Sequence, residues 1–441
     1  MSIRPSLRDV NRTGASPRAA AVSAGVGLVL VVAAMVVPRL LDEDVRVHWP
    51  PLHADWDPRF GLLTLPAIAI GLLLVLVLPR LARTTPWRLL LVSAFTTTWL
   101  WIMALAMTEG TEGLARVFER RQEYVYDAQR VGSIHTMLET FIARIPMDAP
   151  DNWYVHVAGH PPGALLYFVG IDRLGITDPF WIGVVCVTIA STAIVAVMIT
   201  LRTLGSEQLA RSAMPWIVLA PSAVWMGVNG DAVFTAVAAW GLALLAIAAV
   251  HRRALPAIGA GLLLGLCVYL SYGLVLLSIL ALAVLVIAKT WRPLPWTLGG
   301  ALVVAALFTA GGFAWWEAYP VLRERYYAGI ASDRSYSYWV WGNIAAWTFT
   351  VGLAVWAAFP AAARAVRERN VLAWLAAAAL LTILAADVSG MSKAEVERIF
   401  LPFTIWIVAL PSLLPERWHK PLLLSQVVLA LLAQQLLLTR W

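Results

Sequence analysis

The chain of 441 residues is 60% hydrophobic and 13% charged, with a formal net charge of +7. Soluble domains carry about 25% charged residues, so this composition excludes a soluble globular protein and predicts a polytopic membrane protein. The two cysteines, Cys186 and Cys267, lie inside apolar stretches. We expect them to be small buried residues that form neither a disulfide nor a metal site.

Apolar stretches of spanning length follow one another along almost the whole chain, and they predict an all-α fold with about 13 transmembrane helices. They are Ala20–Leu41, Phe60–Pro79, Arg88–Thr108, Pro179–Leu201, Ser212–Val228, Asp231–Val250, Leu255–Ser271, Gly273–Ala288, Thr297–Trp316, Val340–Pro360, Val371–Asp387, Arg398–Leu414 and Pro421–Leu438. Gly163–Leu174 is excluded, because its helix would rise only about 18 Å against a hydrocarbon core of about 30 Å. We expect this stretch to be a half-helix on the outer side.

The charged residues of the predicted loops set the orientation. With a cytoplasmic N-terminus, the inner side holds 18 basic and four acidic residues, a net charge of +14, and the outer side holds 15 basic and 22 acidic residues, a net charge of −7. The inner set includes Arg4, Arg8 and Arg12. Cytoplasmic loops are enriched in Lys and Arg, so we predict a multi-pass cell-membrane protein with its N-terminus inside. The basic charge indicates anionic lipid headgroups as partners and gives no support for nucleic acid.

The long outer loop between residues 109 and 162 carries the first candidate site. Glu123 and Asp127 stand four residues apart, so on a helix both carboxylates would share a face. A carboxylate there can accept a proton, and we take Asp127 as the first candidate for a general base, with Glu123 as its partner or replacement. On this spacing alone an ordinary acidic loop is the alternative. Farther along, apolar residues recur at helical spacing over Ile134–Ile145, which predicts an interfacial helix.

The end of this loop reads Tyr154-Val-His-Val-Ala-Gly-His-Pro-Pro-Gly163. His156 and His160 have the spacing of zinc ligands on a helix, but Gly159 and the prolines break a helix there and no third ligand is near, so we expect no metal. A helix that begins at Pro162 or Gly163 would direct its amide groups outward, and His160 would add a donor. Such an end suits a phosphate. A turn that only caps the helix is the alternative.

The other polar groups at predicted outer ends of spans are candidates for donor binding. Lys393 and Arg398 are the bases nearest to a predicted helix start, and an interfacial anchor is the alternative for them. The candidate donor-binding residues are His156, His160, Asp231, Tyr272, Lys393, Glu395, Glu397 and Arg398.

These motifs, taken in order, resemble the GT-C superfamily of glycosyltransferases that use polyprenyl-phosphate sugars. The resemblance rests on the acidic outer loop, on His160-Pro-Pro-Gly163 and on the later outer Asp231, and it covers roughly residues 88–410. Protein mannosyltransferases carry a comparable His-Pro-Pro turn, and lipid A aminoarabinose transferases a Lys-Pro-Pro turn. The block Gly390-Met-Ser-Lys-Ala-Glu-Val-Glu-Arg-Ile-Phe-Leu-Pro-Phe403 is similar to uncharacterised actinobacterial integral membrane proteins of this superfamily.

The resemblance implies an inverting glycosyltransferase of cell-wall biogenesis that acts on the outer face. It divides the chain into an additional N-terminal hairpin (1–87), a GT-C-like catalytic module (88–290) and a C-terminal module (291–441). The donor would be a polyprenyl-phosphate sugar, the acceptor an envelope glycan, lipid or protein, and no cofactor is expected. Asp55 and Asp57 in the hairpin are alternative bases. The competing functions are a transporter or flippase of lipid-linked sugars and a non-catalytic protein of envelope assembly.

Overall fold

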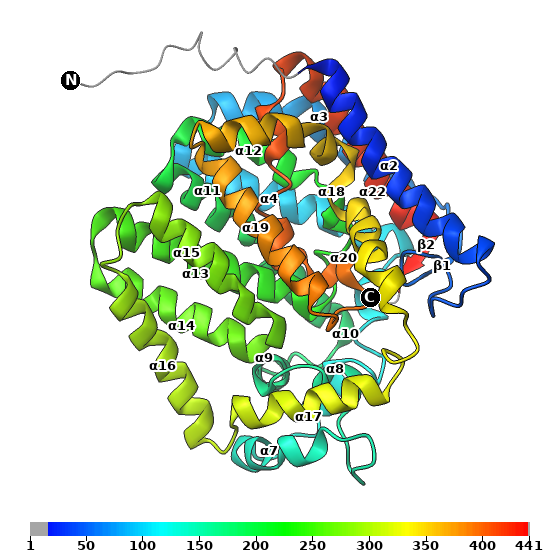
Figure 1. Cartoon of the computed structure of the whole chain (residues 1–441), viewed down its shortest axis with the longest axis vertical. Helices are drawn as coiled ribbons and strands as arrows, with labels where there is room; N and C mark the ends of the chain where they lie inside the picture. Colours follow the sequence, from blue (N-terminus) through cyan, green and yellow to red (C-terminus); the bar gives the residue numbers. More distant parts are fainter. Residues whose placement is uncertain (1–15, 440–441) are drawn as a thin grey trace.

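The structure is a computed structural model that describes residues 16–439, and it is almost entirely helical (Figure 1). Arg4, Arg8 and Arg12 lie outside the described residues. The elements of the first half are α2 (Pro17–Leu40), β1 (Ala54–Trp56), α3 (Thr64–Thr84), α4 (Trp87–Ala106), η1 (Met107–Glu109), α5 (Glu112–Ala115), α6 (Tyr124–Ala128), α7 (Ile134–Thr140), η2 (Ile142–Arg144), α8 (Val155–Ala158), α9 (Pro162–Arg173), α10 (Pro179–Ser191), α11 (Ala193–Leu204) and α12 (Glu207–Val218). Those of the second half are η3 (Pro221–Val224), α13 (Gly230–His251), α14 (Ala254–Leu270), η4 (Tyr272–Leu276), α15 (Leu277–Ile287), α16 (Leu294–Ala310), α17 (Trp315–Ala328), α18 (Tyr336–Arg367), α19 (Val371–Val388), α20 (Val396–Ile399), α21 (Leu401–Thr404), η5 (Leu410–Leu413), α22 (Glu416–Leu436) and β2 (Leu437–Thr439).

Seven helices in the described part of the chain are long and apolar enough to cross a membrane. They are Pro17–Leu40, Thr64–Thr84, Trp87–Glu109, Pro179–Leu204, Gly230–His251, Tyr336–Arg367 and Val371–Val388. An eighth span results if α16 and α17, which are bent by 73° at their junction, count as one. The prediction of an all-α polytopic protein is therefore confirmed, whereas the count of about 13 spans is not.

Two of the predicted spans are broken into short pieces. In the first, α12 ends at Val218 and η3 begins at Pro221, whose ring removes a backbone donor. In the second, the stretch Arg398–Leu414 consists of parts of α20 and α21, irregular turns and η5. Irregular backbone is tolerated at membrane depth only where protein surrounds it, and almost every residue from Phe400 to Pro411 is buried.

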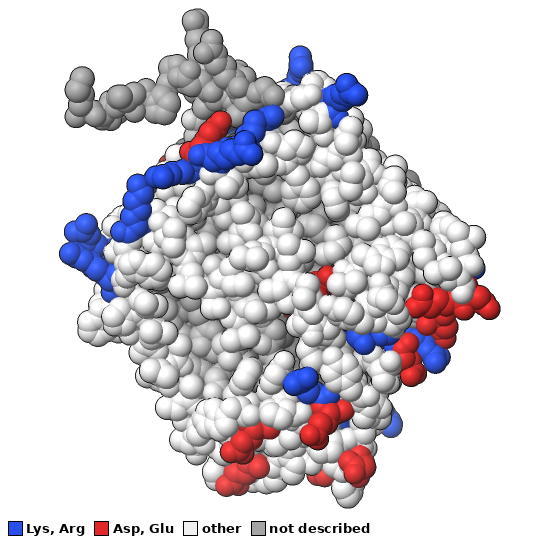
Figure 2. All heavy atoms as spheres, viewed as in Figure 1, with Lys and Arg blue, Asp and Glu red and all other residues white. Residues whose placement is uncertain are grey.

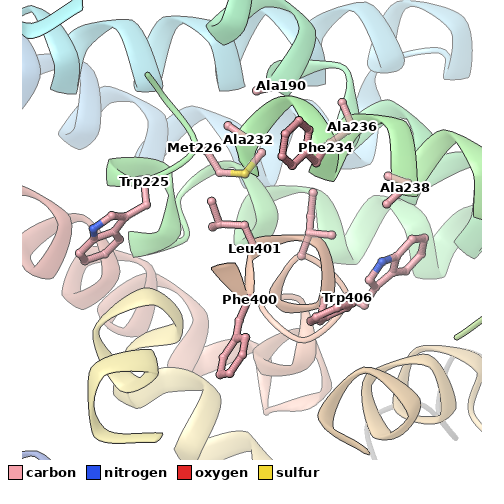
Figure 3. Close-up of a cluster of buried hydrophobic side chains, with 14 of the residues drawn as sticks. Ala190, Trp225, Met226, Ala232, Phe234, Ala236, Ala238, Phe400, Leu401 and Trp406 are labelled. Carbon is pink, nitrogen blue, oxygen red and sulfur yellow. The ribbon is translucent and has the colours of Figure 1, made fainter. Parts of the chain in front are cut away.

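The broken segment lies in the centre of the hydrophobic core. Figure 3 shows Leu401 of this segment facing Met226 and Phe234, which lie near and within α13, whereas Phe400 points to the opposite side. The side chains of Phe400, Leu401 and Trp406 are 0–1% exposed. Burying such side chains contributes about 1.5–3 kcal/mol each, so the core holds the segment, and with it the adjoining α20, in one position.

The short helix α9 begins at Pro162, as the half-helix prediction required, and spans 12 residues. Pro161 is its N-cap and Pro162 its first residue. Proline suits this first position because its ring fixes φ near −65°, which is a helical value. Gly163 packs against the backbone carbonyl of Tyr269 at the end of α14, and a Cβ atom there would collide with that carbonyl. The Pro-Pro-Gly sequence thus serves helix initiation and close helix packing.

The predicted interfacial helix is shorter than Ile134–Ile145. Ser133 caps α7 by accepting a hydrogen bond from the Thr136 amide, the α-helix ends at Thr140, and η2 continues the turn. Met137, Leu138, Phe141 and Ile145 are buried, as their spacing predicted.

On the face shown in Figure 2, most basic and most acidic side chains gather at different edges. Figure 2 shows most of the visible Lys and Arg along the upper left edge, and most of the visible Asp and Glu along the lower and right edges, with a broad uncharged band between them. In the same view α7, α8, α9 and α17 lie in the lower half, towards the acidic edge (Figure 1). This separation agrees with the charge difference of the predicted loops, and the assignment of the acidic edge to the outer face remains a prediction.

A two-stranded sheet joins the first loop to the end of the chain. β1 pairs antiparallel with β2, with Ala54 opposite Thr439 and Trp56 opposite Leu437. Arg59 adds hydrogen bonds to the carbonyl groups of Gln434 and Leu437. The sheet fixes the loop that carries His53.

Candidate functional site

A buried arginine, Arg398, stands at the centre of a charged cluster built from distant parts of the chain. Its Nη1 atom lies 2.5 Å from Asp231 Oδ2, and its Nη2 atom lies 2.7 Å from Glu395 Oε2. The side chains of Arg398 and Asp231 are each only 6% exposed. Burial opposes the charge of the guanidinium, but the two carboxylates outweigh it and raise the pKa of Arg398. The arginine therefore stays charged.

Asp231 owes its position to the start of a spanning helix. Asn229 is the N-cap of α13, and its Oδ1 atom accepts a hydrogen bond of 2.9 Å from the Ala232 amide. The Asn229 side-chain amide also donates to the Trp225 carbonyl at 2.7 Å, which fixes the corner before the helix. Asp231 lies in the first turn, where a negative charge is favoured. The cluster consequently sits at the level where α13 begins.

Glu395 is positioned by an unusual backbone segment. Ala394 and Glu395 have φ values of 69° and 63°, a left-handed conformation that residues with side chains rarely adopt. Asn343 of α18 holds this segment: its Oδ1 atom accepts from the Ala394 amide at 3.0 Å, and its Nδ2 atom donates to the Ser392 carbonyl at 2.6 Å and to Asp387 at 2.8 Å. This geometry puts Glu395 and Arg398 at opposite ends of a single turn.

Glu123 joins the cluster through His156. Its Oε1 atom lies 3.4 Å from His156 Nε2, and His156 Nδ1 lies 3.5 Å from Arg398 Nη2. Burial raises the pKa of Glu123 to about 7, although the charge of Arg398 opposes the shift. Burial, aided by Arg398, lowers the pKa of His156 to about 3, so this histidine is neutral. Because arginine can only donate, His156 Nδ1 is the acceptor and Nε2 carries the proton toward Glu123.

His160 lies beside the cluster, but it does not supply the expected hydrogen-bond donor for a phosphate. Its Nδ1 atom is 2.8 Å from the His156 carbonyl and must therefore carry a proton. Burial lowers the pKa of His160, so Nε2 is left as an acceptor. The start of α9 offers few amide donors as well, because Pro162 has none and the Ala164 amide bonds to the Pro161 carbonyl. The prediction of a phosphate site formed by His160 and this helix end is not supported by the geometry.

Asp127 is separated from the cluster, contrary to the shared helix face that the sequence suggested. The helix α6 begins only at Tyr124, and Glu123 is its N-cap with an extended backbone (φ −88°, ψ 173°). Asp127, inside the helix, accepts a hydrogen bond of 3.4 Å from the Tyr154 amide and lines a cavity that lies outside the charged cluster. Glu123 is thus the carboxyl group of this loop that meets His156 and Arg398.

Three further predicted residues lie at the border of the cluster or outside it. Lys393 donates from Nζ to the Ala331 carbonyl at 2.9 Å and lies over the ring of Tyr327, and it forms no ion pair in the described part of the chain. The ring of Tyr272 packs on Trp315 and Tyr319. Glu397 is 1% exposed, and neither of its carboxyl oxygens has a hydrogen-bond partner among the described residues.

The structure adds two residues that the sequence did not single out. His53 Nδ1 lies 3.2 Å from Glu395 Oε1, and Arg334 Nη1 lies 3.8 Å from the same oxygen and donates to the Lys393 carbonyl at 2.6 Å. Together with Arg398 they lower the pKa of Glu395 well below its usual range, although burial acts in the opposite direction. Asp55 and Asp57, the alternative bases, pair instead with His48 and Arg59 near the surface. No sequence spacing connects His53 to residue 395.

Neither a protein-family model nor a curated protein sequence matches this chain. The resemblance to GT-C glycosyltransferases therefore rests on the motifs of the chain itself.

Proposed function

We propose that this protein is a membrane glycosyltransferase that moves a sugar from a polyprenyl-phosphate donor to an acceptor of the cell envelope. The observation that carries the proposal is the cluster of Glu123, His156 and Arg398 beside Asp231, at the start of the spanning helix α13. A lipid-linked donor holds its phosphate at the membrane boundary. In this cluster the buried cation Arg398 and the buried carboxyl group of Glu123, whose pKa is raised, both lie against His156. A cation and a base are the two groups that glycosyl transfer from a phosphate requires.

In the proposed step the ionised carboxylate of Glu123 takes the proton of an acceptor hydroxyl. The hydroxyl oxygen forms a bond to the anomeric carbon of the sugar while the bond from that carbon to the phosphate oxygen breaks. The electron pair of the broken bond stays on the phosphate oxygen, polyprenyl phosphate leaves, and the configuration at the anomeric carbon inverts. Arg398 stabilises the negative charge that develops on the leaving phosphate.

The electrostatics of the cluster fit these roles. A general base works best when its pKa lies near the working pH, and that of Glu123 is raised to about 7. The neutral His156 directs its Nε2 proton to Glu123 and so orients the carboxylate. Asp231 and Glu395 hold the guanidinium of Arg398 in place, and an arginine held at two points presents its remaining donors in a fixed direction.

A transporter of lipid-linked sugars is the competing function, and the distribution of buried charge argues against it. Eight charged residues of the described chain are buried, and they belong to the predicted outer ends or outer loops. They are Glu123, Asp127, Asp231, Arg334, Asp387, Lys393, Glu397 and Arg398. A transport path would require polar groups continuing towards the opposite face.

The experiment is a deletion strain complemented with variants. We expect the strain to accumulate the polyprenyl-phosphate sugar on the outer leaflet, where a membrane-impermeant reagent that oxidises vicinal diols reaches it. The wild-type protein should reverse the accumulation, and Glu123→Gln should not. Glu119, an exposed carboxylate of the same loop, provides the matched control, and Glu119→Gln should act like wild type. Accumulation on the inner leaflet would support a transporter, and unchanged lipid-linked sugars would contradict the proposal.

A further inference from the structure

A cavity lies next to the charged cluster and is separate from it. It has a volume of about 700 Å³ and lies between α6, the whole length of α7 and the segment of residues 150–154. Small-molecule sites commonly measure about 300–1,000 Å³, so the cavity is large enough for a ligand. None of Glu123, His156 and Arg398 lines it.

We propose that this cavity binds a neutral sugar unit of the acceptor glycan through Asp127. The role as acceptor site rests on the glycosyl transfer proposed above, whereas the binding of a neutral sugar does not depend on it.

The under-satisfied group in the cavity is Asp127. The residue is 6% exposed, yet its carboxylate accepts one hydrogen bond from residues 16–439, at 3.4 Å from the Tyr154 amide. A carboxylate has about four acceptor positions, and buried ones are normally filled. Ligand hydroxyl groups would fill the remainder with short charge-assisted hydrogen bonds.

The charges around the cavity favour a neutral ligand. Its charged lining residues are two aspartates and two arginines, Asp127, Asp151, Arg130 and Arg144, so the formal charges cancel. Arg144 is already engaged, because its Nε atom lies 3.1 Å from Asp151 and its guanidinium stacks 3.3 Å from the ring centre of Trp153. A metal ion would meet the arginines and a phosphate would meet the aspartates. Sugar hydroxyl groups both donate and accept, which matches a lining with both kinds of partner.

One short segment connects the cavity to the charged cluster. The Tyr154 amide donates to Asp127, and two residues later the His156 amide donates to the Gln122 carbonyl at 3.2 Å. Asp127 lies in α6, and Glu123 is the N-cap of the same helix. The cavity and the charged cluster are therefore built from the same two short segments of the long loop.

The test measures binding without any donor. The full chain in lipid nanodiscs is titrated with neutral trisaccharides of mannose, arabinose, galactose and glucose, and with inorganic phosphate and a Ser/Thr-rich peptide as competitors, using saturation-transfer NMR and calorimetry. We expect at least one trisaccharide to bind. Asp127→Ala, which removes a charge-assisted hydrogen bond, should weaken this binding about tenfold or more.

A matched pair of variants separates the cavity from the rest of the surface. Thr136 and His135 are exposed neighbours on α7, and Thr136 lines the cavity whereas His135 does not. Thr136→Trp should fill the cavity and weaken binding at least tenfold, and His135→Trp should bind like wild type. The proposal is overturned if no trisaccharide binds at millimolar concentration, if Thr136→Trp binds unchanged, or if only phosphate or the peptide binds. The binding assay contains no donor and no transfer takes place in it, so a failure of the transfer proposal would leave this result intact.

Discussion

Replacing Arg398 by methionine tests whether the cluster is held by desolvated ion pairs. Asp231 would lose its only ionic partner in the described chain, and its side chain is 6% exposed. Glu395 would keep His53 and Arg334. One stranded carboxylate is therefore the main cost, and breaking a buried pair in this way typically costs about 3–5 kcal/mol. We expect Arg398→Met to lose about that much stability in equilibrium unfolding in detergent micelles.

The chain offers both a control and a rescue for this experiment. Arg83 and Glu416 form an ion pair with side chains 65% and 70% exposed, and such surface pairs contribute about 0–1 kcal/mol. Arg83→Met should therefore have little effect. Adding Asp231→Asn to Arg398→Met should recover much of the stability that Arg398→Met loses, because Asp231 then no longer leaves an unpaired buried charge. Equal losses for Arg398→Met and Arg83→Met would refute the description of a desolvated cluster.

Three further predictions follow from the same contacts. Because only ionised Glu123 accepts a proton and its pKa is raised to about 7, the transfer rate should fall about tenfold per pH unit below 7, and a flat profile from pH 5 to 7 would exclude this base. Asn343→Ala, which leaves the Ala394 amide unpaired, should cost about 1–3 kcal/mol in micelle unfolding and lower transfer as well, and an unchanged midpoint would show that Asn343 does not hold the left-handed segment. Burial raises the folded-state pKa of Glu397 to about 7 from the ordinary 4.5, so its neutral form contributes stability that is present below pH 4.5 and is lost as the pH rises to 7. Glu397→Gln should therefore melt at a higher temperature than wild type at pH 8, and the difference in melting temperature should be smaller at pH 5. A larger difference at pH 5 than at pH 8 would contradict a buried neutral carboxyl group.

Composition and hydrophobic runs were sufficient to predict an all-α polytopic protein, because both depend on residue type alone. The start of α9 was also predictable, since Pro162 favours a first helical position and Gly163 allows close packing. The number of spans was not predictable, because a run such as Arg398–Leu414 is equally apolar whether it crosses the membrane as one helix or folds as short buried turns.

The sequence singled out most of the residues of the cluster, but it did not predict which of them contact each other. Charged residues in outer loops pointed to Arg398, Glu395 and Asp231, because burying them would be costly without partners. Local spacing misled at Glu123 and Asp127, where the helix begins one residue after Glu123 and turns the two carboxylates to different surroundings. The contribution of His53 depends on β1 pairing with β2, a contact between the two ends of the chain that no local pattern contains.

A transfer assay that compares Glu123→Gln with Asp127→Asn tests whether Glu123 is the general base. Membranes containing each variant are supplied with a labelled polyprenyl-phosphate sugar, and label in the acceptor is measured against acceptor concentration, with Glu119→Gln as the control. Glu123→Gln should lose about 10²–10⁴-fold in kcat, whereas Asp127→Asn should mainly raise the KM for the acceptor. Full activity in Glu123→Gln together with loss of kcat in Asp127→Asn would contradict the account and make Asp127 the base.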